Sequence, residues 1–241
     1  MPKWKCLHTK TTSAKKCIDF GHRDCLKQMC ETHNITDIEK IRINFDKNSV
    51  ENRYNNCDVD ILSYICELSD YDTLKFLIEE QNYNPNNSHF PLRGYEYLLS
   101  SICYGNNFDI FLYIYDHASQ NGVKLMDFVY PCMYGNIDML KYIHANMTKK
   151  ERTKHKHIPD WGLYHAITIN HIPIVKFLFD KYDLDMDSDE QSLLAFAQYS
   201  NLKMWKFLME KKNVSITNKI VTAAKKYNDD KEVYVFLSAT L

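Results

Sequence analysis

The sequence predicts an all-α fold, a solenoid of about seven irregular helix-turn-helix units, and three observations carry this prediction. A block of two mostly apolar residues, a lysine, an aromatic residue and an aliphatic residue occurs four times. A small or turn-forming residue stands four positions before each block. An apolar stretch with helical spacing precedes that residue. The blocks span residues 73–77, 139–143, 174–178 and 204–208.

The turn-forming residues define the expected units, once three weaker copies of the pattern are included. They are Gly21, Ser69, Asn106, Gly135, Asn170, Ser200 and Asn228. Gly and Asn tolerate the left-handed backbone that ends a helix, whereas Ser is a weaker choice. One helix pair cannot bury both of its apolar faces, so we expect neighbouring pairs to stack into a single domain over residues 1–241.

The interval between the first two turns is longer than one unit. We interpret residues 34–57 as an insertion that forms a long loop or contains one extra helix. The alternation of Ile41, Ile43 and Phe45 also permits a short strand. Insertions in solenoids often lie on the binding face, but a tolerated loop without function is the equal alternative.

The turn and second helix at residues 21–27 and 135–141 resemble those of the ankyrin-repeat family. The family's T-P-L-H-x-A motif is absent, and residues 163–166 match it only in part. The resemblance implies paired antiparallel helices with projecting loops, and protein–protein recognition without catalysis. The sequence style is similar to divergent ankyrin proteins of large DNA viruses and protists. That similarity implies a viral or parasite factor that binds or masks a host protein, in the cytoplasm or the host nucleus.

Aromatic residues near the start of the first helices are the candidate partner-binding residues. Tyr and Trp bury much area and keep a polar group, which makes them frequent at interface hot spots. In ankyrin-like stacks this region borders the concave surface that contacts partners. Packing in the core is the alternative for each of them. The candidates are Tyr95, Tyr97, Tyr130, Trp161 and Tyr164.

Composition excludes several classes of protein. Lys plus Arg is 30 and Asp plus Glu is 31, so the overall field does not favour nucleic acid. The six glycines are too widely spaced for a phosphate-binding loop, and we assign no cofactor-binding or catalytic residue. No apolar run reaches about 18 residues, and no secretory signal begins the chain. We therefore expect a cytoplasmic protein with reduced thiols and no membrane association.

The alternative function is a metal- or thiol-dependent hydrolase that uses Cys and His residues near the amino terminus. Zinc prefers four such ligands in closely spaced pairs, and this group approaches that pattern without matching a standard site. Cys25 also occupies a packing position of the repeat, where a buried thiol acts as a small hydrophobic group. The candidate zinc ligands are Cys6, His8, Cys25, Cys30 and His33.

Two charged segments follow successive units. Residues 149–157 form a basic loop, and the other alternative function is nucleic-acid binding through it. Residues 180–190 are acidic. Equivalent loops of a solenoid project side by side, so we expect these two segments to be neighbours.

Trp205 occupies an apolar position of the fourth block. We expect its indole to be buried between the sixth and seventh units.

Overall fold

The structure is a computed structural model that describes residues 42–43, 59–80, 94–123, 125, 127–154, 158–182, 184, 190–211 and 214–241. Apart from one short pair of strands, the regular structure in these residues is helical, as the sequence predicts. The chain divides into two compact units, Met1–Leu125 and Met126–Leu241. The expectation of a single domain stays a prediction.

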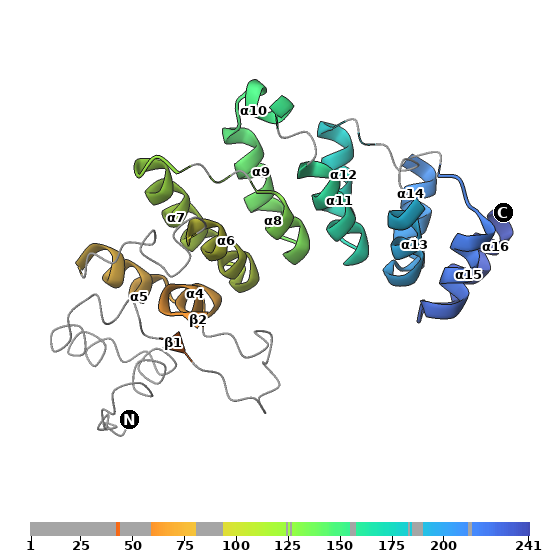
Figure 1. Ribbon diagram of the computed structural model, residues 1–241, viewed down its shortest axis with the longest axis horizontal. Coiled ribbons are helices and arrows are strands. Elements are labelled where there is room, and N and C mark those ends of the chain that lie inside the picture. Colours follow the sequence, from red (N-terminus) through yellow and green to blue (C-terminus); the bar gives the residue numbers. More distant parts are fainter. Residues whose placement is uncertain are drawn as a thin grey trace, which may run out of the picture. The chain divides into compact units, whose positions relative to one another are not determined.

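In the residues that the structure describes, the first unit has two helix pairs and the strand pair. Helix α4 packs against α5 and α6, and α6 packs against α7 (Figure 1). Strand β1 pairs antiparallel with β2, with Ile43 opposite Val59. The elements are β1 (Arg42–Ile43), β2 (Val59–Asp60), α4 (Ile61–Glu67), α5 (Tyr71–Lys75), η1 (Phe76–Glu80), α6 (Gly94–Gly105) and α7 (Phe108–Gln120).

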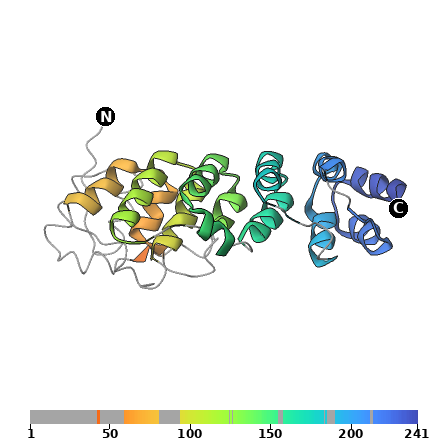
Figure 2. The same ribbon diagram turned by 90° about the horizontal axis from the view of Figure 1, so that it is seen from above.

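The second unit contains four helix pairs and one extra short helix. The first helices of the pairs pack in a row, α8 against α11, α11 against α13 and α13 against α15. Figure 2 shows the second helices of the last three pairs in a separate layer beside this row. The helices are α8 (Val129–Tyr134), α9 (Ile137–Asn146), α10 (Lys149–Lys154), α11 (Ile158–Thr168), α12 (Ile172–Lys181), α13 (Glu190–Tyr199), α14 (Leu202–Lys211), α15 (Asn218–Tyr227) and α16 (Lys231–Thr240).

Every predicted turn residue within the described part of the chain lies between the two helices of a pair. The backbone is left-handed at Ser69, Asn106 and Asn170, and also at Gly135, where φ is 81°. A Cβ atom at residue 135 would lie 2.9 Å from Cδ2 of His171 in the next turn. Gly135 is therefore required both by its own conformation and by close packing between consecutive turns.

The turns of the last three pairs in the second unit are joined by hydrogen bonds, which we call the turn ladder. The Asn170 side chain donates to the carbonyl of Tyr199 at 3.3 Å and accepts from the backbone N–H of Asn201 at 2.6 Å. The buried hydroxyl of Ser200 donates to the carbonyl of Ile167 at 3.1 Å. The ladder thus pairs carbonyl and N–H groups that helix ends leave unsatisfied.

The next step of the turn ladder connects the last two pairs. Asn228 Nδ2 donates to the carbonyls of Ala197 and Ser200, at 2.8 and 2.9 Å. The Asp230 carboxylate accepts from the backbone N–H of Leu202 at 3.1 Å and also caps α16. The first unit has an equivalent contact, because Ser69 Oγ donates to the carbonyl of Gly105 at 2.8 Å.

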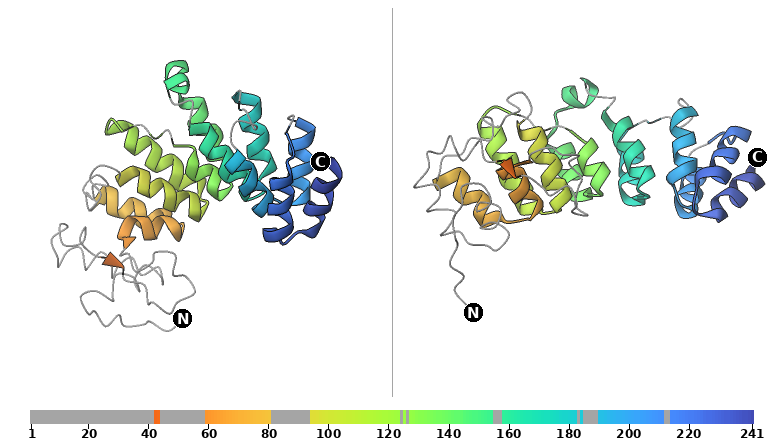
Figure 3. Two further views of the ribbon diagram at one scale, coloured as in Figure 1. Left: turned by 45° about the vertical axis from the view of Figure 1, so that its right-hand side comes forward. Right: turned by 60° about the horizontal axis from the view of Figure 1, so that its bottom comes forward.

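One sequence expectation about loops is wrong where residues are described. Lys149–Lys154, expected as a basic loop, forms helix α10, which extends beyond the end of α9 (Figure 3). Thr148 and Glu151 form a capping box: Thr148 N–H donates to Glu151 Oε2 at 2.7 Å, and Glu151 N–H donates to Thr148 Oγ1 at 3.3 Å. Within the 34–57 insertion, Arg42–Ile43 forms a strand, the alternative that the Ile41–Phe45 alternation permitted.

The predicted burial of Trp205 is confirmed, since its indole is 0% exposed. Met204 and Leu208 of the same helix are fully buried as well. The small residues Ala166 and Ala197 of the first helices are also fully buried. A second close approach occurs at Gly162, where a Cβ would lie 2.9 Å from Sγ of Cys132 on α8.

Replacing Trp205 by alanine should lower the free energy of unfolding by about 3–5 kcal/mol, because it removes a large buried aromatic and leaves a cavity. Urea denaturation followed by circular dichroism measures the change. The control is Trp161→Ala, which removes an indole that is 63% exposed and should change stability by less than about 1 kcal/mol. Equal losses in the two variants would contradict the packing assigned to Trp205.

Replacing Asn228 by alanine should lower the free energy of unfolding by about 1–3 kcal/mol. The change leaves the carbonyls of Ala197 and Ser200 without this donor and also removes the acceptor of the Asp230 N–H. Urea denaturation is again the measurement. Asn218→Ala is the matched control, since its exposed side chain bonds to no described residue. A control that loses as much stability as Asn228→Ala would refute the importance of the turn ladder.

Candidate functional site

The first helices of the second unit carry an open groove on their exposed side. One hollow, of about 680 Å³, lies between α11 and α13, and a second, of about 490 Å³, lies between α13 and α15. Leu194 and Gln198 of α13 line both hollows, and we call the surface that the two hollows make on these helices the first-helix groove. It is lined by Asp160, Trp161, Tyr164, Gln191, Ser192, Leu194, Ala195, Gln198, Asn218, Lys219, Thr222, Ala223, Lys226 and Tyr227.

Aromatic side chains lie at both ends of the first-helix groove. Trp161 of α11 is 63% exposed, and Tyr227 of α15 is 55% exposed. Tyr164 is half-buried, and its ring packs against Phe196 of α13 at a centroid distance of 5.7 Å. Tyr164 is therefore held in place by the fold, whereas the Trp161 indole is free to contact another molecule.

The middle of the groove carries one amide side chain beside the apolar Leu194. The side-chain amide of Gln198, which is half-buried, has no hydrogen-bond partner among the described residues. An amide offers both a donor and an acceptor, the same pair of groups as a peptide bond. This position can therefore hydrogen-bond to the backbone of a bound chain.

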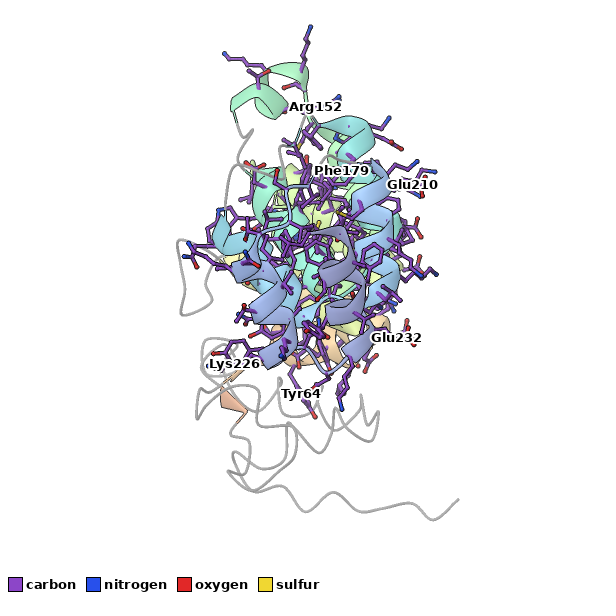
Figure 4. All side chains as sticks on the ribbon, turned by 90° about the vertical axis from the view of Figure 1, so that its right-hand side faces the viewer. Tyr64, Arg152, Phe179, Glu210, Lys226 and Glu232 are labelled. Atoms are coloured by element: carbon purple, nitrogen blue, oxygen red, sulfur yellow. The ribbon has the colours of Figure 1, made fainter. Side chains whose placement is uncertain are left out.

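Charge differs between the two ends of the groove. Asp160 is the acidic lining residue beside Trp161, whereas Lys219 and Lys226 line the α15 end. The Nζ atom of Lys226 lies 4.7 Å from the ring centroid of Tyr227. In Figure 4, Lys226 lies on the α15 side of the second unit and Glu232 on the opposite, α16 side. The groove thus has an acidic end at α11 and a basic end at α15.

The structure brings together two of the five predicted partner-binding residues. Trp161 and Tyr164 line the same hollow on α11. Tyr130 is half-buried on α8 and lies outside the lining of either hollow. Tyr95 and Tyr97 belong to α6 in the other unit, and their side chains lie outside the description.

Sequence reasoning missed the α13 and α15 residues of the groove, although the repeat itself indicates them. Trp161 stands nine positions before the turn residue Asn170. The residues nine positions before Ser200 and Asn228 are Gln191 and Lys219, and both line the groove. Gln198 and Lys226 share the position two before their turns. Choosing the residues that occupy the position of Trp161 in the later helix pairs would have found these groove residues of α13 and α15. Choosing residues by aromatic type could not.

A second cluster joins the ends of α9 and α12. His144 Nδ1 lies 2.7 Å from the hydroxyl of Tyr182, and the His144 ring meets Phe177 edge-on at 5.5 Å. Burial lowers the pKa of His144, and the positive charges of Arg152 and Lys181 lower it further. Burial also raises the pKa of Tyr182 to about 12. Both side chains are therefore neutral near pH 7, and the cluster serves packing.

The described cysteines do not form a reactive group. Cys66, Cys103 and Cys132 are buried and not disulfide-bonded. Burial, with a contribution from Asp127, raises the pKa of the Cys132 thiol, which disfavours the nucleophilic thiolate. Within the described ranges, no group of three or more His, Cys, Asp or Glu side chains could hold a metal ion. The candidate zinc ligands Cys6, His8, Cys25, Cys30 and His33 lie outside the described residues.

The charged segments are described only in part. Arg152 of α10 donates to the carbonyl of Met147, from Nη2 at 2.8 Å and from Nε at 3.1 Å. Residues 155–157 and most of 180–190 lie outside the description, so the expected contact between the two segments stays a prediction. The alternative of nucleic-acid binding through 149–157 likewise stays open.

Comparison with protein-family models, with curated proteins and with solved structures finds no match to this chain. None of the described helices combines the length and apolar composition needed to cross a membrane.

We expect the second unit to lose stability in mild acid. Because the pKa of His144 is lower in the folded protein than in the unfolded chain, the unfolded state binds more protons. The stability that the neutral His144 ring contributes is complete above about pH 6.5, and it is lost as pH falls through the lowered pKa of His144 in the folded protein. The urea midpoint should therefore fall more between pH 7.5 and pH 5 for the wild type than for His144→Gln. The same decrease in both proteins would show that His144 does not carry this dependence.

Proposed function

We propose that this chain is a non-catalytic, ankyrin-like repeat protein that binds another protein through the first-helix groove. The observation that carries the proposal is the exposed indole of Trp161 beside a hollow of about 680 Å³, on the same face as Tyr164 and Gln198. A large exposed aromatic next to a mostly apolar hollow with a few polar groups is a typical anchor for a protein partner.

The arrangement of the helix pairs supports the repeat assignment. The second unit has four helix pairs, with first helices packed in a row and turns joined by the turn ladder. Turn residues recur about every thirty positions in this part of the chain, near the length of an ankyrin unit. Stacked repeats present extended surfaces that contact partners.

The groove supports binding more than catalysis. Its described lining combines exposed aromatics, amides and a few charges, and among these residues there is no paired acid and base and no nucleophile beside a base. Tyr164 is fixed by Phe196, which lowers the entropic cost of ordering it in a complex. The hydrolase and nucleic-acid alternatives gain no specific observation from the described residues.

Selection of a displayed random-peptide library against the full-length chain tests the proposal. Selected peptides should bind Trp161→Ala at least about thirtyfold more weakly than wild type, because truncating an interface hot spot costs about 2 kcal/mol or more. Fluorescence anisotropy with labelled peptides measures the change.

Tyr199→Ala is the matched control, since Tyr199 is 62% exposed but does not line the groove. This variant should bind the selected peptides as wild type does. The proposal fails if no peptide is enriched, or if enriched peptides bind Trp161→Ala as tightly as wild type.

A further inference from the structure

We propose that the partner of the first-helix groove is an extended peptide segment with a basic side chain at one end and an acidic side chain about six residues away. This inference rests on the proposed function and adds the chemistry of the partner. The basic side chain binds at α11, and the acidic side chain binds at α15.

The α11 end fits a basic side chain, arginine above all. Asp160 and Trp161 line the same hollow, and Asp160 forms no interaction with any described residue. A guanidinium stacks on an indole face and pairs with a carboxylate at the same time. Among the described residues that line this hollow, none is basic, so none competes for the carboxylate.

The α15 end fits an acidic side chain. Lys219 and Lys226 are seven residues apart on one helix, which places them on the same face, and the lining that the structure describes for this hollow contains no acidic residue. The cation–π contact with Tyr227 holds the Lys226 ammonium beside the groove. A carboxylate placed here meets the positive charge of Lys226.

The middle of the groove fits the backbone of an extended chain. The half-buried amide of Gln198, unpaired among the described residues, lies between the two charged ends and lines both hollows. Leu194 beside it provides an apolar floor for one aliphatic side chain. The groove therefore offers backbone recognition in the centre and charge recognition at the ends.

The distance between the ends sets the spacing of the two charges. Packed helices lie about 8–10 Å apart, so α11 and α15, separated by α13, are about 20 Å apart. An extended chain advances about 3.3 Å per residue, which gives about six residues between the charges.

Four fluorescein-labelled nine-residue peptides test the proposal against the full-length chain. All have leucine at position 5 and serine or alanine elsewhere, and they differ only at positions 2 and 8: Arg and Glu, Glu and Arg, Arg and Arg, or Glu and Glu. At least one of the two mixed-charge peptides should bind about tenfold more tightly than both single-sign peptides, because it forms ion pairs at both ends. Its affinity should fall as salt rises.

Charge-reversal variants assign each end. Asp160→Lys should weaken binding of the mixed-charge peptide about fivefold and strengthen binding of the Glu–Glu peptide. Lys226→Glu should also weaken binding of the mixed-charge peptide about fivefold, but it should strengthen binding of the Arg–Arg peptide. Lys225→Glu is the matched control on the same helix. The Lys225 ammonium lies 5.4 Å from the ring centroid of Tyr234 on α16 and does not line the groove.

Three outcomes would overturn the inference. The first is that all four peptides bind equally well, or that none of them binds. The second is that Lys225→Glu changes peptide affinity as much as Lys226→Glu, and the third is that a single-stranded oligonucleotide binds more tightly than any peptide. These outcomes are distinguishable from failure of the proposed function. If library-selected peptides bind in a Trp161-dependent way but ignore the charge reversals, the groove binds peptides and only the charge pattern is wrong.

Discussion

The last three helix pairs of the second unit depend on the hydrogen bonds between their consecutive turns. Each tight turn leaves helix-end carbonyl and N–H groups that need partners when the next pair packs against it. Asn170, Ser200 and Asn228 supply those partners to the neighbouring turn, over sequence separations of 28 to 33 residues. Because each bond joins one pair to the next, the ladder fixes how the first helices line up. The groove exists because of that alignment.

The sequence predicted the turn positions from the left-handed backbone of tight turns, which is only one of the two physical reasons for the residues found there. Left-handed backbone explains Ser69, Asn106, Gly135 and Asn170, which all have positive φ. Asn228 does not have a left-handed backbone, since its φ is −87°. Asparagine stands there because its amide bonds to two carbonyls of the preceding turn. The local conformational preference of asparagine cannot reveal this role. Both acceptors belong to the preceding helix pair, and the contact exists only after the pairs have stacked.

The helical pattern predicted the core better than the surface. Trp205 sits in a block whose spacing alone requires burial, and it is fully buried. Helix α10 was missed because its signal, Thr148 and Glu151 in a capping box, was overlooked within a run of charge. The groove was found only at Trp161 and Tyr164, because the candidates were limited to aromatic residues near the start of the first helices. Gln198 and Lys226 carry no distinctive type, and their importance comes from position.

The equivalent positions of the groove show why a regular framework can hold an irregular site. Nine residues before the turn, successive units carry Trp161, Gln191 and Lys219. Helix spacing keeps this position on the open side of the first helices, so packing restricts little which residue occupies it. The residue four before the turn, Ala166 in α11, is by contrast fully buried, and its small size allows close approach of the neighbouring helix. Burial thus restricts the residues four before the turns and leaves those nine before the turns free to differ in charge and shape, which produces the acidic and basic ends of the first-helix groove.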